Sequence, residues 1–131
     1  MMGKRVCLLA TCLMLVLGCG GGNVLDPKFQ PQVANNPDNF QFQATGVTNV
    51  TQTLTYNWQN SGAAASINQA CSVSGGSAAI HLRDATNAIV YSKDLKANGT
   101  FTNNPGTAGT WKIEVVLSGV SGTLNFRAQK N

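Results

Sequence analysis

Cys19 has the most distinctive setting of any potentially reactive side chain in this 131-residue chain. It closes a segment that starts with two positive charges, Lys4 and Arg5, and continues as the uncharged, largely apolar run Val6–Leu17. That run is too short to cross a bilayer as a helix, which takes roughly 20 residues. A basic start, a short apolar stretch and a small residue before the break are typical of a cleaved secretory signal. We therefore predict a signal peptide over residues 1–18.

The four residues that end at this cysteine, Val16-Leu17-Gly18-Cys19, resemble the lipobox of bacterial lipoproteins. In that family the cysteine sulfur receives a diacylglyceryl group, the signal is cut before the cysteine, and the new amino group is often acylated as well. The resemblance implies lipidation of Cys19 and stable anchorage, because two or more acyl chains hold a protein on a membrane. Gly20 stands where aspartate favours inner-membrane retention in Gram-negative lipoproteins, so the resemblance implies an outer-membrane location. The alternative is an ordinary secretory signal in which Cys19 is incidental.

The remaining titratable side chains give little support to catalytic or metal chemistry. His81 is the single histidine, and the alternation around it predicts an outward, solvated position. A serine hydrolase would need it as the base, and no Gly-x-Ser-x-Gly elbow surrounds any serine. Metal sites and glycosidases need converging ligands or carboxylates, whereas the five acids are spread along the chain: Asp26, Asp38, Asp84, Asp94 and Glu114. We expect that the protein is not an enzyme and that it has no catalytic residue, bound metal or cofactor.

Cys71 is the one cysteine left once Cys7 and Cys12 leave with the signal and Cys19 is acylated. A lone cysteine cannot form an internal disulfide. Free cysteine is among the most buried residue types, so we predict that Cys71 is a small buried hydrophobic side chain.

The aromatic side chains could form a ligand platform if they pointed outward. Tyr56, Trp58 and Trp111 share parity with aliphatic neighbours on their strands, which predicts that they belong to the core. Tyr91 is the least constrained of the aromatics. It is our candidate for a ligand contact at the surface.

The charge of the chain argues against nucleic acid as a partner. Removal of residues 1–18 leaves 113 residues with seven basic and five acidic side chains. The basic residues are scattered along the chain instead of forming a patch, so we expect no nucleic-acid binding. A chain of this length can form one domain with a modest core.

The segment 19–39 contains three of the four prolines and shows no sustained period of 2 or 3.6. Gly20–Gly22 would act as a flexible joint, and the prolines would stiffen the rest. We predict a tether between the lipid and the domain. The alternative is that its apolar side chains fold back onto the domain: Val24, Leu25, Phe29 and Val33.

From residue 40 to residue 131 the sequence alternates between apolar and polar side chains, with Gly- and Asn-rich turns and no helical period. Short strands are expected over 40–43, 50–58, 65–73, 78–83, 89–93, on either side of Asn98-Gly99, and over 111–117 and 124–128. Gly75-Gly76 is expected to be a turn, and the fifth strand points either Val90 or Ile89 and Tyr91 inward. Seven or eight such strands predict an all-β fold, a two-sheet antiparallel β-sandwich.

Part of this domain resembles the small jelly-roll modules of secreted bacterial proteins known as pre-peptidase C-terminal domains. The residues concerned are Ala79–Asp84, Val90-Tyr91, Gly109–Val115 and Ser121–Phe126. The resemblance implies a jelly-roll β-sandwich with a non-catalytic accessory role, and it carries over no site.

The leading functional hypothesis is a non-enzymatic, lipid-anchored envelope lipoprotein whose sandwich binds another envelope protein or serves as a structural module. A carbohydrate-binding surface module is the alternative, because sandwiches with exposed aromatic side chains can bind glycans. A small hydrolase that depends on His81 is the third class.

Overall fold

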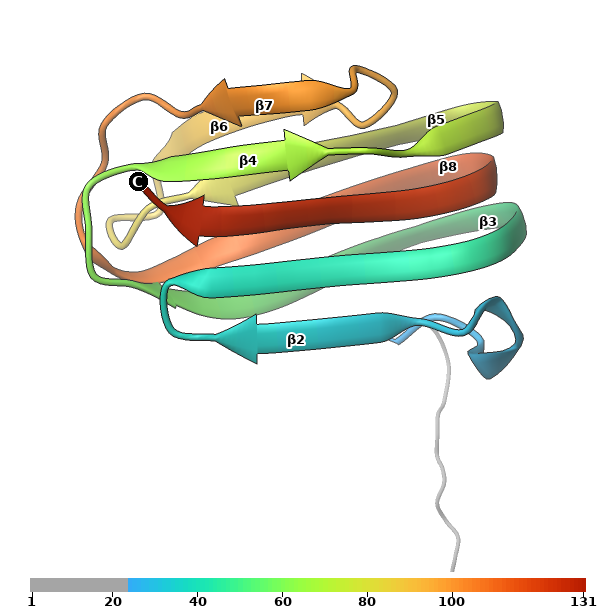
Figure 1. Cartoon of the computed structure of the whole chain (residues 1–131), viewed down its shortest axis with the longest axis horizontal. Helices are drawn as coiled ribbons and strands as arrows, with labels where there is room; N and C mark the ends of the chain where they lie inside the picture. Colours follow the sequence, from blue (N-terminus) through green and yellow to red (C-terminus); the bar gives the residue numbers. More distant parts are fainter. Residues whose placement is uncertain (1–23) are drawn as a thin grey trace, which may run out of the picture.

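The computed structural model describes residues 24–131, and this part of the chain forms an all-β sandwich (Figure 1). The predicted antiparallel all-β fold is confirmed, since every strand pair is antiparallel. A short 3₁₀ helix, η2 (Pro27–Phe29), comes first. Seven strands follow: β2 (Gln32–Asn36), β3 (Asn39–Asn60), β4 (Ala65–Gln69), β5 (Ser72–Arg83), β6 (Ile89–Asp94), β7 (Gly99–Thr102) and β8 (Gly109–Lys130).

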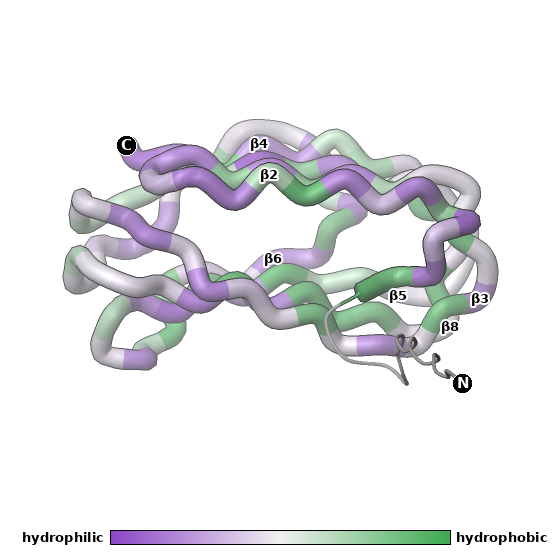
Figure 2. The backbone as a smooth tube through the Cα atoms, turned by 90° about the horizontal axis from the view of Figure 1, so that it is seen from below, coloured by the Kyte–Doolittle hydropathy of each residue, from purple (hydrophilic) through white to green (hydrophobic). Residues whose placement is uncertain are grey.

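The two longest strands, β3 and β8, pass through both layers of the sandwich (Figure 2). Residues 39–44 of β3 pair with 124–129 of β8 in one layer, and residues 52–60 pair with 109–117 in the other. The first layer is completed by β2 at one edge and by β4 and β7 at the other. The second layer is completed by β5 and β6. Apart from the additional edge strand β2, this order of strand segments is that of a jelly roll.

Each long strand crosses between the layers at a bend rich in residues with positive φ. Gly46 and Asn49 lie at the bend of β3, Gly76 at that of β5, and Gly119 and Gly122 at that of β8. The strand register shifts at the same places, as expected where a bulge turns a strand. The prediction of a turn at Gly75-Gly76 is therefore wrong, because the pair lies within β5 and carries it from one layer to the other.

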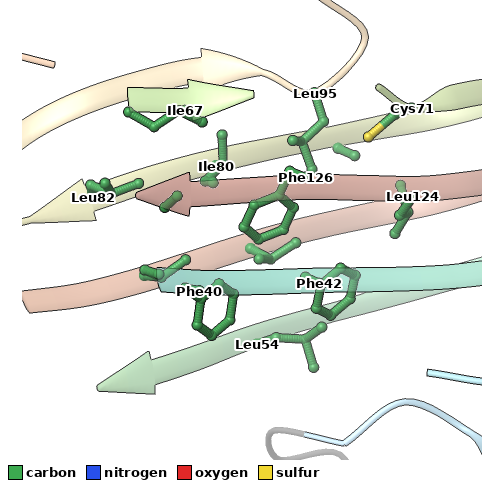
Figure 3. Close-up of a cluster of buried hydrophobic side chains, with 14 of the residues drawn as sticks. Phe40, Phe42, Leu54, Ile67, Cys71, Ile80, Leu82, Leu95, Leu124 and Phe126 are labelled. Atoms are coloured by element: carbon green, nitrogen blue, oxygen red, sulfur yellow. The ribbon is translucent and has the colours of Figure 1, made fainter. Parts of the chain in front are cut away.

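The core lies between the layers and is formed by the alternating apolar residues of both (Figure 3). Trp58 of β3 and Trp111 of β8 are cross-strand partners with no exposed surface, and their rings meet edge to face with centroids 6.0 Å apart. The core positions predicted for both tryptophans are thus confirmed, while Tyr56 is half-buried at the edge. Cys71 is buried and free of a disulfide, as predicted.

The domain starts earlier than the sequence pattern indicated. Leu25 and Phe29 are buried, with 2% and 5% of their surface exposed, and β2 pairs with β3 along its whole length. Asp26 caps the turn between the two apolar residues by accepting a hydrogen bond from the backbone N–H of Lys28 at 3.0 Å. The prediction of a tether is therefore wrong over 24–39. The signal peptide, Cys19 and residues 20–23 lie outside the described residues.

Candidate functional site

The predicted lipidation site, Cys19, lies outside the described residues, so its modification stays a prediction. The described chain begins five positions later at Val24, whose carbonyl accepts a hydrogen bond from Gln52 Nε2 at 2.9 Å. Leu25 next to it is buried in the core. The chain is therefore held against β3 from its first described residues. Within residues 24–131, no helix has the length and apolar character needed to cross a membrane.

Tyr91, the predicted surface contact, is buried with only 7% of its surface exposed. Its hydroxyl donates a hydrogen bond to Gln69 Oε1 at 2.7 Å, and burial raises its pKa to about 12. The placement of Tyr91 on the surface is wrong. A register shift between Leu82 and Arg83 turns both Val90 and Tyr91 inward. Val90 is therefore inward, as the first alternative predicted, but the side chain next to it is inward as well.

Tyr91 does line a hollow between the edge strands β6 and β7, which we call the β6–β7 hollow. It has a volume of about 300 Å³, the lower end of the range for small-molecule sites. Lys93 Nζ lies 4.3 Å from the ring centroid of Phe101 across the hollow. The rest of the lining is Val90 and four polar residues: Ser92, Thr102, Asn103 and Asn104. An aromatic ring, an ammonium group and amides together could bind a polar ligand such as a sugar.

The opposite edge of the sandwich, where β2 joins β3, contains a second hollow of about 300 Å³. We call it the apolar groove, because its lining is almost entirely hydrocarbon: Val24, Leu25, Pro31, Val33, Phe42 and Tyr56. Burial raises the pKa of Tyr56 to about 12. The Tyr56 ring packs against Phe40 and Phe42, with centroids 5.2 Å and 6.2 Å away. The sequence pattern does not predict this groove, because it places Leu25 and Val33 in a tether.

The outer face of the layer that contains β2 is rich in amides. Gln32, Gln41 and Gln43 surround a shallow hollow of about 180 Å³. The next strand, β8, places Asn125 opposite Gln43 and Arg127 opposite Gln41. Side chains of this kind offer both donors and acceptors, so the face is suited to hydrogen bonding with another macromolecule.

His81 lies on the outer face of the other layer, as its strand parity predicts, and is half-buried there. Its cross-strand neighbours are Glu114 on β8 and Ser92 on β6, the residue types of a hydrolase triad. The carboxylate of Glu114, however, accepts a 3.0 Å ion-pair hydrogen bond from Arg83 Nε. Nδ1 of His81 is buried and has no hydrogen-bond partner. Ser92, His81 and Glu114 therefore lack the hydrogen bonds that join nucleophile, base and acid in a triad.

Asp84 is the acid with the most polar contacts, and these contacts are structural. Its Oδ1 accepts hydrogen bonds from the side chain and backbone of Thr86 at 2.7 and 2.9 Å and from the N–H of Ala88 at 3.1 Å. Its Oδ2 accepts one from the N–H of Thr107 at 2.8 Å. These bonds, led by that of the Thr86 hydroxyl, lower the pKa of Asp84 to about 2. Among residues 24–131, His, Cys, Asp and Glu side chains form no group of three that could hold a metal ion.

No protein-family model and no curated protein matches this chain. Among solved structures, it is similar to a chain in the crystal structure of accessory secretory proteins 1, 2 and 3 of Streptococcus pneumoniae. The identity is 12% and the TM-score 0.38, over 77% of this chain and 85% of the other. A likeness of that strength carries no argument about the function of this chain.

Proposed function

We propose that this protein is a non-enzymatic lipoprotein of the bacterial envelope, anchored through acyl chains on Cys19, whose β-sandwich binds another envelope protein. The anchor would place it in the outer membrane, in keeping with Gly20 after the modified cysteine. The observation that carries the proposal is the sequence of the first 19 residues, in which a basic start, an apolar run and Val16-Leu17-Gly18-Cys19 occur together.

The arrangement of the domain supports this proposal. Leu25, which is buried in the core, comes only six positions after Cys19, so an anchored chain would hold the sandwich close to the membrane surface. The amide-rich outer face, with Gln41, Gln43 and Arg127, then offers a broad polar surface to a protein partner. Such an assignment needs no group on the sandwich to perform chemistry.

The anchor is tested by expression in a bacterium that processes lipoproteins. We expect the mature protein to begin at Cys19, to carry lipid mass on the peptide that contains it, and to fractionate with membranes. Cys19→Ser should abolish the lipid and leave uncleaved precursor or soluble protein. Recovery of the wild-type chain as soluble, unlipidated protein cleaved elsewhere would refute the anchor.

Carbohydrate binding is the second candidate function, and the observation that favours it is the β6–β7 hollow. There the ring of Phe101 and the ammonium of Lys93 line the hollow together with hydroxyl and amide groups, and Tyr91 lines it as well. Sugars are bound by this combination of an aromatic ring and convergent polar groups.

A glycan array tests this second candidate. Saturable binding that is lost in Phe101→Ala and in Lys93→Gln, and retained in the matched surface variant Val116→Ala, would favour it over the protein-binding proposal. Tyr91→Phe tests whether the hydroxyl takes part, without removing the buried ring. Absence of saturable binding to any glycan would refute it.

A further inference from the structure

We propose that the apolar groove docks on the lipid bilayer, so that the anchored sandwich rests with its β2 edge against the membrane. This inference rests on the proposed lipid anchor and adds to it an orientation and a second contact with lipid. The occupant of the groove is the hydrocarbon and glycerol region of the bilayer surface.

The first argument is that apolar side chains are exposed on this edge. Among the described residues, four large hydrophobic side chains are exposed, and two of them, Val24 and Val33, line this groove. Val24 has 71% of its surface exposed and Val33 has 43%. The half-buried Tyr56 also lines the groove, and tyrosine suits a membrane interface because its ring is apolar and its hydroxyl polar.

The second argument is the short distance between the groove and the lipid attachment. Four residues separate Cys19 from Val24, and the five steps along the chain, at up to about 3.6 Å each, span no more than about 18 Å. Val24 lines the groove, and the hydrogen bond from Gln52 Nε2 to its carbonyl holds it there. The span from Cys19 to Val24 is therefore also the span from Cys19 to the groove. A connection this short between two contacts with one membrane gives an effective concentration of the order of millimolar. Even if the groove binds lipid only weakly, it would therefore be occupied by lipid once Cys19 is anchored.

The third argument concerns charge and decides which lipid is needed. The segment from Val24 to Val33 carries one acid and one base, Asp26 and Lys28, and these cancel. The carboxylate of Asp26 is occupied as the cap of η2, and Lys28 Nζ lies 5.2 Å from the ring centroid of Phe29. Attraction to the bilayer should thus be apolar. We expect docking on phosphatidylcholine, which is zwitterionic and has no net charge, with little dependence on anionic lipid or salt.

The experiment uses the lipidated protein purified from membranes and reconstituted into phosphatidylcholine vesicles. In a Cys71→Ala background, an environment-sensitive fluorophore is attached to Val33→Cys or, as the matched control, to Ile89→Cys. Ile89 is also an exposed apolar strand residue, with 51% of its surface exposed, but it lies on β6 at the other edge. Lipid mass on Cys19 and flotation with the vesicles are measured first.

We expect the Val33 label to shift to the blue and to be quenched at least two-fold by doxyl-labelled lipid, while the Ile89 label is unchanged. Val24→Asp should abolish the quenching at Val33, and Val116→Asp should not, both variants being checked for an unchanged melting temperature. Lipidated protein that floats but shows equal quenching at both positions overturns the docking and leaves the anchor standing. Self-quenching of the Val33 label that depends on protein density, without quenching by lipid, assigns the groove to a second copy and also overturns it. Absence of lipid on Cys19 overturns both proposals.

Discussion

Trp111 lies where β8 packs against β3, and its loss should be among the costliest for the fold. Its ring is fully buried against Trp58, and its Nε1 donates a hydrogen bond to the carbonyl of Thr107 at 2.8 Å. Trp111→Ala would leave a large cavity and an orphaned carbonyl, so we expect a loss of about 3–5 kcal/mol in the free energy of unfolding. Urea denaturation measures this loss. Val116→Ala, at an exposed position on the same strand, should change stability by less than about 0.5 kcal/mol.

Asp84 should make stability depend on pH at the acid end. Its folded-state pKa is held at about 2, below the ordinary 3.8, by the four hydrogen bonds that the carboxylate accepts, led by that of the Thr86 hydroxyl. A lowered carboxyl pKa stabilises the folded state above the unfolded pKa, and this stabilisation is lost as pH falls from about 4 to about 2. We expect the melting temperature of the wild type to fall more steeply than that of Asp84→Asn over this window. Parallel curves for the two proteins would contradict the structural importance of this carboxylate.

Tyr91 shows what the sequence could not provide at the level of single residues. Parity predicted Trp58 and Trp111 correctly, because they lie in an uninterrupted ladder where alternate residues face the core. At Tyr91 the ladder is shifted by one residue, and this shift depends on the pairing of β6 with β5. The local sequence Ile-Val-Tyr carries no sign of that pairing.

The bends of the long strands depend on glycine where two backbones approach each other. Gly76 in β5 has φ +69°, and a Cβ there would run into the carbonyls of Ser118 and Gly119 on β8. Gly76→Ala must therefore force the two strands apart as well as strain the backbone. We expect destabilisation well above the roughly 1–2 kcal/mol of a left-handed non-glycine residue, measured by urea denaturation.

Gly46 in β3 is the matched control for this prediction. Its φ of +61° is similar, but a Cβ there would have no neighbour within 4 Å. Gly46→Ala should therefore cost only the backbone strain. Equal losses in the two alanine variants would mean that conformation alone, and not the close approach of β5 and β8, makes glycine necessary at Gly76.

The sequence thus predicts that the elements are strands, but it does not predict how long the strands are or where the first one begins. The alternation of apolar residues identified the strands and their inward faces, because that pattern is local. Gly75-Gly76 indicated a turn, since a glycine with positive φ interrupts the alternation in the same way in a hairpin and in a strand that changes layers. The segment from Leu25 to Val33 has no period, and its burial depends on the distant partners that β3 supplies. The apolar groove could not be found without that burial.

At the scale of the molecule, the two ends of the strand order offer different surfaces. The hollow at the β2 edge is apolar and includes Val24, five positions after the proposed anchor at Cys19, whereas the hollow at the β6 and β7 edge mixes polar residues with the ring of Phe101 and the ammonium of Lys93. If the apolar edge rests on lipid, the β6–β7 hollow lies on the far side of the sandwich from the membrane. That edge, and the amide-rich outer face, would then remain accessible to a partner.

The same topology should make folding slow. Cross-strand partners of β3 and β8 come from nearly opposite ends of the domain, as in the pair Asn39 and Gln129. Non-local pairing of this kind has a high entropic cost of loop closure, and all-β domains of similar topology fold in milliseconds to seconds. Trp58 and Trp111 face each other across these two strands, so their fluorescence reports when the pairing closes. In stopped-flow refolding from urea, we expect the main fluorescence change within milliseconds to seconds. A change that is complete within about 100 μs, the time of nonspecific collapse, would contradict a folding barrier set by the pairing of β3 with β8.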